Sequence, residues 1–263
     1  MNILDQIIAS KRRDLEKRMT GVPPESFNNR RSMKRTPFSM KAAILNEHKS
    51  GIIAEFKRKS PSRGVINAEA SVEEVTTGYT RSGASALSVL TDRDFFGGDE
   101  SDLMTARELN PIPILRKDFI FDGYQIIEAR AMGADAILLI AAVLNPGEVD
   151  NLARQAHDLG MEVLLEIHAR EELDRISDAV DMIGINNRNL KSMSVDINTS
   201  LELISELPRE FVRISESGLS SPQVIRQLKS AGYQGFLIGE RFMRATDPVV
   251  AFGDFVKLLR SET

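Results

Sequence analysis

The stretch Ile52-Ile53-Ala54-Glu55-Phe56-Lys57-Arg58-Lys59-Ser60-Pro61-Ser62 begins as an apolar run and ends in a cluster of charges. Its first residues predict a β-strand buried on both faces, which is typical of a parallel sheet. Because side chains alternate along a strand, Glu55 and Lys57 should share one face, and Phe56 and Arg58 the other. Enzymes with parallel sheets build their sites at the carboxyl ends of strands. A solvated strand end with an incidental ion pair is the plainer alternative.

Seven further apolar runs follow, each with polar residues and a helix-like segment behind it. The eight predicted strands are Ile52–Phe56, Ala86–Leu90, Ile112–Arg116, Ala136–Ile140, Glu162–Glu166, Met182–Asn186, Phe211–Ser215 and Gly235–Gly239. The predicted helices are Val72–Ser82, Tyr124–Met132, Pro146–Leu159, Arg170–Ala179, Asn198–Leu207 and Pro222–Ala231. Several of them end at a glycine, and Pro222 suits the first turn of its helix.

This alternation predicts an α/β protein with parallel strands joined by crossover helices. Eight such units close most naturally into a (β/α)8 TIM barrel. The rival is a doubly wound open sheet, which would carry a glycine-rich dinucleotide turn after its first strand. This chain has Lys57-Arg58-Lys59-Ser60 there. We therefore expect a single barrel domain over 51–263, preceded by a helical extension over 1–50.

The extension begins with an amphipathic segment. Its apolar residues fall on one helical face, with the basic residues on or near the other: Ile3, Leu4, Ile7, Ile8 and Leu15 against Lys11, Arg12, Arg13 and Lys17. Such a helix can bind a membrane or RNA, but packing on its own domain is the simpler expectation.

The composition excludes several classes of binding partner and of catalytic chemistry. The chain has 263 residues, a net charge of −4 and a pI near 5.6, which gives no general attraction to nucleic acid or anionic membrane. It has no cysteine, which excludes disulfides and thiolate catalysis and fits a cytoplasmic location. It lacks a dinucleotide fingerprint, and its three histidines lack ligand-like spacing, so we expect neither cofactor nor metal.

The predicted strand ends carry polar residues that a barrel would gather on one rim. They are Glu55, Lys57, Ser60, Lys117, Glu166, Asn186, Arg188, Glu216 and Ser217. One charged residue at a strand end is usually a solvated rim residue, but several strands share this feature. Lysines facing carboxylates in a partly desolvated mouth shift each other's pKa, which supplies both an acid and a base.

Glycines follow the last two predicted strands. Gly218 follows Ser217, and Gly239 precedes Glu240. In many barrels these two loops bind phosphate through backbone N–H groups, together with the N-terminus of a short helix. We therefore expect a phosphate site at Gly218 and Gly239.

At this point the sequence resembles a known family over nearly its whole length. The motifs are Ile53-Ala54-Glu55-Phe56-Lys57-Arg58-Lys59-Ser60-Pro61-Ser62, Ser88-Val89-Leu90-Thr91-Asp92, Phe96-Gly97-Gly98, Leu115-Arg116-Lys117-Asp118-Phe119, Leu164-Leu165-Glu166, Ile183-Gly184-Ile185-Asn186-Asn187-Arg188-Asn189-Leu190, Ser215-Glu216-Ser217-Gly218 and Leu237-Ile238-Gly239-Glu240. They resemble the indole-3-glycerol-phosphate synthase family of tryptophan biosynthesis. This resemblance implies ring closure, decarboxylation and dehydration of 1-(2-carboxyphenylamino)-1-deoxyribulose 5-phosphate.

The resemblance also implies roles for the rim residues. Lys117 resembles the general acid; Lys57 would pair with the substrate carboxylate or assist the second proton transfer. Glu55 and Glu166 resemble the carboxylates that orient the lysines and accept protons, with the base undecided between them. The remaining implied groups are Asn186 in catalysis, Arg188 for the anthranilate carboxylate, Ser217 and Glu216 in substrate binding, Phe96, Phe119 and Leu190 as an apolar wall, and Ser60, Gly218, Gly239 and Glu240 around the phosphate.

Several alternatives stay open. The nearest is another phosphate-binding barrel enzyme, such as a sugar-phosphate isomerase or an indole-glycerol lyase. A non-catalytic relative is the second, although it would be expected to lose Lys117, Glu166 or Asn186. Two basic segments, at 11–13 and 29–35, keep a weaker RNA-binding hypothesis open. We expect a phosphorylated small-molecule substrate and a monomer or weak homodimer, with no nucleic acid or membrane partner.

Overall fold

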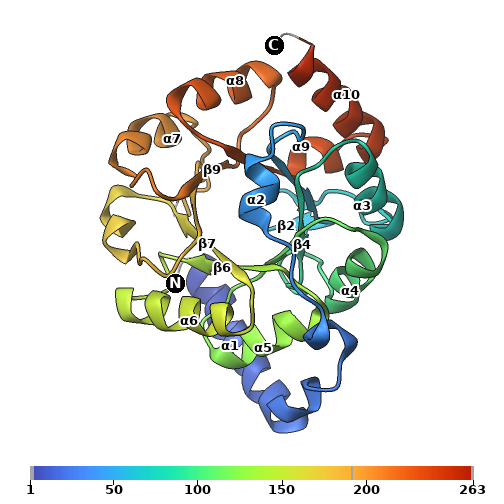
Figure 1. Cartoon of the computed structure of the whole chain (residues 1–263), viewed down its shortest axis with the longest axis vertical. Helices are drawn as coiled ribbons and strands as arrows, with labels where there is room; N and C mark the ends of the chain where they lie inside the picture. Colours follow the sequence, from blue (N-terminus) through green and yellow to red (C-terminus); the bar gives the residue numbers. More distant parts are fainter. Residues whose placement is uncertain (1–2, 191, 262–263) are drawn as a thin grey trace.

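The computed structural model describes residues 3–190 and 192–261 and forms a closed barrel of parallel strands, which Figure 1 views nearly end-on. The strands neighbour one another in the order β1-β10-β9-β8-β7-β6-β5-β4. Their bounds are β1 (Ile52–Phe56), β4 (Ala86–Leu90), β5 (Ile114–Lys117), β6 (Ala136–Ile140), β7 (Glu162–Ile167), β8 (Met182–Asn186), β9 (Val212–Glu216) and β10 (Gly235–Ile238). The predicted TIM barrel is confirmed.

Alternation along the strands divides the core into two layers. Ile53, Leu115 and Ile214 belong to the cluster inside the barrel. Ala54 and Phe56 belong to the larger cluster between the barrel and its helices. In β1 this parity turns Glu55 inward, as the alternation predicts.

The helices surround the barrel. They are α3 (Val72–Arg81), α4 (Glu100–Leu109), α5 (Gly123–Met132), α6 (Pro146–Asp158), α7 (Asn198–Leu203), α8 (Pro222–Ala231), the short α9 (Glu240–Met243) and α10 (Pro248–Arg260). Side-chain caps explain where several begin. The Asn145 side chain accepts from the backbone N–H of Glu148, whose side chain accepts in return, and Ser221 caps α8 ahead of Pro222.

The structure corrects parts of the predicted pattern. The predicted helix over 170–179 is a short 3-10 helix, η3 (Arg170–Arg175), and α7 passes into another, η4 (Ile204–Glu206). The pattern missed α4, α10 and a small hairpin of β2 (Lys59–Ser60) with β3 (Gly64–Val65). Three strands end one residue later than predicted, at Lys117, Ile167 and Glu216, and so include these residues.

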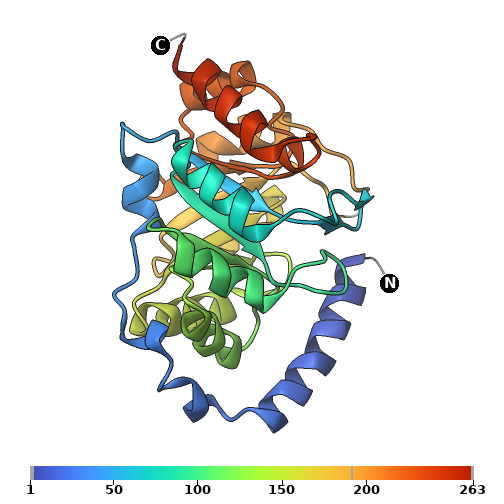
Figure 2. The same ribbon diagram turned by 90° about the vertical axis from the view of Figure 1, so that its right-hand side faces the viewer.

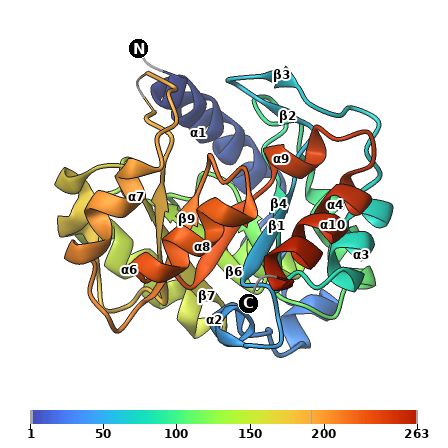
Figure 3. The same cartoon turned by 90° about the horizontal axis from the view of Figure 1, so that it is seen from above.

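The N-terminal segment spans both ends of the barrel. Helix α1 (Ile3–Gly21) lies at the carboxyl end of the strands, and α2 (Met40–Leu45) lies at the opposite end (Figure 3). Between them the chain passes around the outside through η1 (Pro24–Phe27) and η2 (Arg31–Lys34), as Figure 2 shows. Met40 and Ile44 of α2 join the interior cluster and close the barrel base.

One prediction for α1 was wrong. Lys11 does not lie on the exposed basic face but is buried on the same face as Ile7 and Leu15. Spacing of four residues places all three on one stripe, and carboxylates of the barrel compensate the buried ammonium.

The basic segments make contacts within the chain. Arg35 pairs with Asp135 at 2.7 Å, and the Arg30 guanidinium lies over the Phe27 ring. No helix within the described residues is both long and apolar enough to cross a membrane.

Candidate active site

A cavity of about 570 Å³ opens at the carboxyl end of the strands, a volume suited to a small-molecule ligand. Every predicted site residue lines it: Glu55, Lys57, Ser60, Phe96, Lys117, Phe119, Glu166, Asn186, Arg188, Leu190, Glu216, Ser217, Gly218, Gly239 and Glu240. The sequence analysis missed some lining residues, notably Ile3, Leu4 and Ile7 of α1, and Arg63 and Arg244.

Lys117 forms the centre of the charged part of the cavity. Its Nζ lies 2.9 Å from Glu166 Oε2 and 3.7 Å from Glu216 Oε2. Burial lowers the pKa of Lys117, but the carboxylates of Glu166, Glu216 and Glu55 outweigh burial and raise it. Lys117 is therefore fully protonated at neutral pH and holds a proton for transfer.

The two carboxylates beside Lys117 differ in protonation. Burial raises the pKa of Glu166, but Lys117 and His168 outweigh burial and lower it. Burial and the neighbouring Glu166 raise the pKa of Glu216 well above its ordinary value. Lys117 and His168 both face Glu166, whereas Glu216 has only Lys117 at a longer distance, so Glu166 favours its ionised form and Glu216 favours its protonated form.

His168 is a site neighbour that the sequence analysis did not identify. Its ring is buried, with Nε2 3.2 Å from Glu166 Oε1 and Nδ1 3.4 Å from Glu172 Oε2, although neither contact has hydrogen-bond geometry. Burial lowers the pKa of His168, but the two glutamates outweigh burial and raise it to about 9. Its position in the sequence could have identified it, because His168 lies two residues after Glu166 and directly follows the end of β7.

A second ion pair lies on β1 and just beyond it. Lys57 Nζ lies 2.6 Å from Glu55 Oε1, so the two side chains share one face as the alternation predicts. Gly239 provides the space for this pair, since a Cβ there would lie 2.4 Å from Glu55 Oε1. Gly184 does the same for Glu216, at 2.3 Å. The requirement for glycine is stronger at Gly239, where a Cβ would also lie 2.8 Å from the Glu55 Cβ, than at Gly184, where it would meet the end of the Glu216 side chain.

The loop after β9 has an unusual backbone. Ser217 and Gly218 are consecutive residues with positive φ, 66° and 73°. Such a conformation is strained for serine, and strain of this kind concentrates at functional sites. The Asn187 side chain fixes the turn by donating to the Ser217 carbonyl at 3.0 Å.

Glu240 is surrounded by cations at the start of α9. Its carboxylate lies 3.1 Å from Arg63, 3.5 Å from Arg188 and 3.8 Å from Arg244. Three guanidinium groups outnumber the one carboxylate, so this end of the cavity favours an anion. Arg188 thus lies beside the expected phosphate loop.

The opposite wall is apolar. The rings of Phe96 and Phe119 lie with centroids 6.0 Å apart at an interplanar angle of 40°. Leu190 and the α1 residues Ile3 and Ile7 are further apolar residues that line the cavity. The cavity therefore combines an aromatic wall, two lysine–carboxylate pairs and a cationic end.

The fold and cavity define a class: an α/β barrel enzyme with proton-transfer groups and an anion-binding end. Two solved structures share the fold. 3-Hexulose-6-phosphate synthase from Salmonella typhimurium superposes with a TM-score of 0.62 at 13% identity, covering 81% of this chain and 99% of that one. Tryptophan synthase subunit alpha from Legionella pneumophila gives 0.61 at 14% identity, covering 85% and 97%.

Sequence comparison identifies the family. The family model "Indole-3-glycerol phosphate synthase" matches residues 4–254. The chain is 48% identical over 259 residues to the indole-3-glycerol phosphate synthase of Bacteroides thetaiotaomicron, covering 98% of this chain and 99% of that protein. It is 43% identical over 256 residues to that of Koribacter versatilis, covering 96% and 98%. This chain belongs to the indole-3-glycerol phosphate synthase family, decarboxylating lyases of tryptophan biosynthesis, as its motifs predict.

Proposed function

We propose that the cavity converts 1-(2-carboxyphenylamino)-1-deoxyribulose 5-phosphate into indole-3-glycerol phosphate, carbon dioxide and water. The observation that supports this most strongly is the meeting of the Lys117 cluster with an aromatic wall and a cationic end. These three features match the ketone, the aromatic ring and the phosphate of this substrate.

Lys117 is the proposed acid of ring closure. The ring carbon that bears the carboxylate attacks the ribulose ketone, and the ketone oxygen takes a proton as the new bond forms. The ammonium of Lys117 supplies that proton, and ionised Glu166 at 2.9 Å orients it. Loss of carbon dioxide then returns the electron pair to the ring. Asn186, at the end of β8, lines the same cavity and would bind the reacting part of the substrate.

Glu55 is the proposed base of dehydration. The new hydroxyl leaves as water when it is protonated, and a proton leaves the neighbouring carbon to form the indole double bond. Glu166 is a poor base because two cations stabilise its ionised form, and burial beside Glu166 makes Glu216 favour its protonated form by raising its pKa. Glu55 has Lys57 at 2.6 Å, and this pair is placed to exchange the protons of the second stage.

Binding is divided along the cavity. Phe96, Phe119 and Leu190 would hold the aromatic ring, and Arg188 or Lys57 would meet its carboxylate. Ser60, Gly218, Gly239 and the first backbone N–H groups of α9 would hold the phosphate. The Glu240 side chain would then hold Arg63 and Arg188 near the anion without contacting it.

We propose a cytoplasmic enzyme that is a monomer or a weak homodimer and needs no cofactor, metal, nucleic acid or membrane. Within the described residues, no group of three or more His, Asp or Glu side chains is arranged to hold a metal ion.

The test is direct conversion by the purified protein after chelator treatment and without added cofactor. Indole absorbance and fluorescence should rise together with carbon dioxide, because the steps need only proton transfer and charge stabilisation. The chain has no tryptophan, which keeps the fluorescence background low. A folded sample that binds the substrate without forming indole would support a non-catalytic relative. Loss of activity with the chelator would overturn the metal-free mechanism.

A further inference from the structure

Lys11 is a buried cation on an otherwise apolar stripe of α1. Its side chain is 11% exposed and lies between Ile7 and Leu15. A leucine at this position would pack on the barrel without the cost of burying an ammonium. Docking of the helix alone therefore does not explain why a lysine occupies this position.

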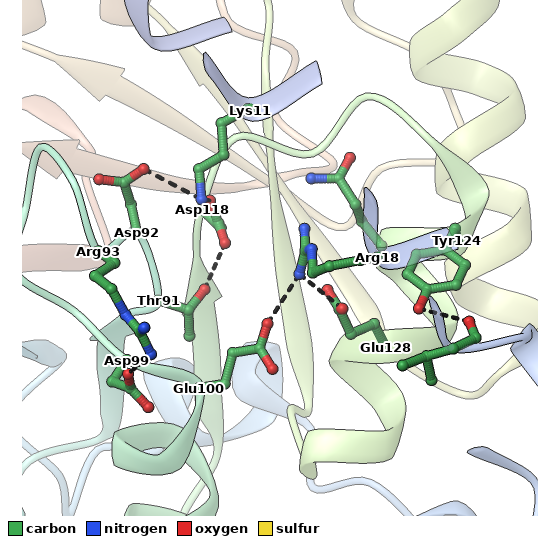
Figure 4. A network of polar contacts seen from close by, with 12 residues as sticks. Lys11, Arg18, Thr91, Asp92, Arg93, Asp99, Glu100, Asp118, Tyr124 and Glu128 are labelled. Atoms are coloured by element: carbon green, nitrogen blue, oxygen red, sulfur yellow. Dashed lines mark hydrogen bonds and ion pairs between the residues drawn. The ribbon is translucent and has the colours of Figure 1, made fainter. Parts of the chain in front are cut away.

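The ammonium of Lys11 lies between two carboxylates that follow neighbouring strands (Figure 4). Its Nζ lies 2.7 Å from Asp118 Oδ1, just after β5, and 3.2 Å from Asp92 Oδ2, just after β4. Asp92 and Asp118 are almost fully buried. Asp118 also has the buried Arg116 at 3.2 Å, so without Lys11 it is Asp92 that would face Asp118 with no cation of its own within the described part of the chain.

Both carboxylates also fix the backbone of the aromatic wall. Asp92 Oδ1 accepts from the N–H groups of Phe95 at 2.8 Å and Phe96 at 3.1 Å. Asp118 Oδ1 accepts from the N–H of Phe119 at 2.8 Å. The same two aspartates therefore hold Lys11 on one side and the loops of Phe96 and Phe119 on the other.

We propose that Lys11 is a positioning residue that sets the spacing of the Phe96 and Phe119 rings, and with it the binding of the substrate's aromatic ring. Charge balance between its ammonium, Asp92 and Asp118 holds the two loops at one separation. Lys11 acts through the two aspartates and does not itself contact the substrate or the reacting atoms. The inference rests on the proposed function, since it assigns the aromatic ring of that substrate to the Phe96–Phe119 wall.

A matched control lies on the same helix. Arg18 also ties α1 to the barrel, through Glu100 at 2.8 Å and Glu128 at 2.7 Å. Figure 4 shows this pair of contacts apart from the Asp92–Asp118 pair. Arg18→Met therefore weakens the docking of the helix while Lys11 keeps its contacts with Asp92 and Asp118. Arg18 reaches Asp118 only indirectly, through Glu128 and Arg116.

The experiment compares Lys11→Met with Arg18→Met by steady-state kinetics and by inhibition with inorganic phosphate. Lys11→Met should raise KM for the substrate by about tenfold to a hundredfold, the range that a misplacement of about 1 Å produces. The inhibition constant for phosphate should stay unchanged, because the phosphate loops lie after β9 and β10. Arg18→Met should leave KM within about threefold of the unmodified value, below the size of a positioning effect.

A compensating variant separates positioning from helix docking. In Lys11→Met, the added substitution Asp92→Asn removes one of the facing charges and keeps an oxygen for the Phe96 N–H. It should restore part of the lost affinity. If Lys11→Met folds poorly, Asp92→Ala carries the same test, because it leaves the Lys11–Asp118 pair but removes the acceptor of the Phe96 N–H; KM should rise there also.

Three results would overturn the proposal: an unchanged KM, equal effects of Lys11→Met and Arg18→Met, or a parallel rise in the phosphate inhibition constant. The two proposals can fail separately. Affinity for the substrate is also measured by the fluorescence of its carboxyphenylamino group in a Lys117→Gln background, where turnover is not required. Failure of the unmodified chain to form indole would contradict the proposed function, whereas unchanged affinity in this background would contradict the role of Lys11.

Discussion

Both ends of the barrel bury carboxylates, but the two ends differ in how completely the carboxylate oxygens are paired. At the base, Asp135 is fully buried and both of its oxygens are paired. Oδ1 accepts from Arg35 and from the backbone N–H of Phe38, both at 2.7 Å. Oδ2 accepts from Arg107 at 2.6 Å and from the backbone N–H of Ile114 at 2.8 Å.

At the mouth, Asp92 and Asp118 are paired with Lys11, but the buried carboxylate of Glu216 is only partly paired. Glu216 Oε1 has no hydrogen-bond partner among residues 3–190 and 192–261, and its nearest cation is Lys117 at 3.7 Å from the other oxygen. A saturated buried carboxylate stabilises the fold, whereas an unsaturated one costs stability and is retained for another reason. We therefore assign Asp135 at the base to the stability of the fold, and Glu216 at the mouth to the chemistry of the site.

The largest expected effect is at the mouth. Lys117→Gln should reduce turnover by about two to four orders of magnitude, the usual effect of losing a general acid. Substrate affinity should be largely kept, because the aromatic wall and the cationic end remain. Single-turnover indole formation with bound substrate measures this, and a variant that keeps most of its activity would remove Lys117 from the mechanism.

The next effect is at the base. Asp135→Ala should lower the free energy of unfolding by about 3–5 kcal/mol, because it leaves Arg107 buried without its carboxylate. Urea unfolding measures the loss, and kcat of the folded protein should be unchanged. Asp254→Ala, which breaks an exposed pair with Lys257, is the control and should change stability little. Equal losses in the two variants would contradict the comparison.

A smaller effect concerns pH. The folded-state pKa of His168, about 9, lies above its ordinary value of 6.5, so ionised His168 stabilises the fold. This stabilisation is complete below pH 6.5 and is lost as pH rises to about 9. The difference in stability between the unmodified chain and His168→Gln should therefore shrink over that window. A difference that is constant with pH would show that the ring contributes packing alone.

The sequence predicts the barrel and its rim well because both depend on local patterns. Strand parity places Lys117 with Leu115 inside the barrel, and resemblance to the family supports each rim residue. The pattern fails where distant segments meet. Nothing near Asp135 indicates that Arg35 and Arg107 converge on it, and the helical pattern of α1 gives no sign that its face meets two aspartates at Lys11.

Local chemistry explains the remaining misses. The segment over 170–179 has few apolar residues, and its side chains make competing bonds. Glu172 accepts from the backbone N–H of His168, and the Ser177 hydroxyl accepts from the backbone N–H of Ala179. Such bonds offer the backbone an alternative to a regular helix, so only a 3-10 turn forms.

Glu216 tests the division between the two ends most directly. Its pKa is raised in the folded state, so it opposes folding above its ordinary value of 4.5. Glu216→Gln should therefore keep or increase the free energy of unfolding at pH 7, and this gain should vanish below pH 4.5. The same variant should lose activity, because Glu216 is a predicted substrate-binding residue and its carboxyl group lies 3.7 Å from the proposed acid Lys117. The test is to measure urea unfolding and indole formation on one preparation of Glu216→Gln. Lower activity with undiminished stability is the predicted result. Full activity with a loss of stability like that of Asp135→Ala would contradict the division between the two ends.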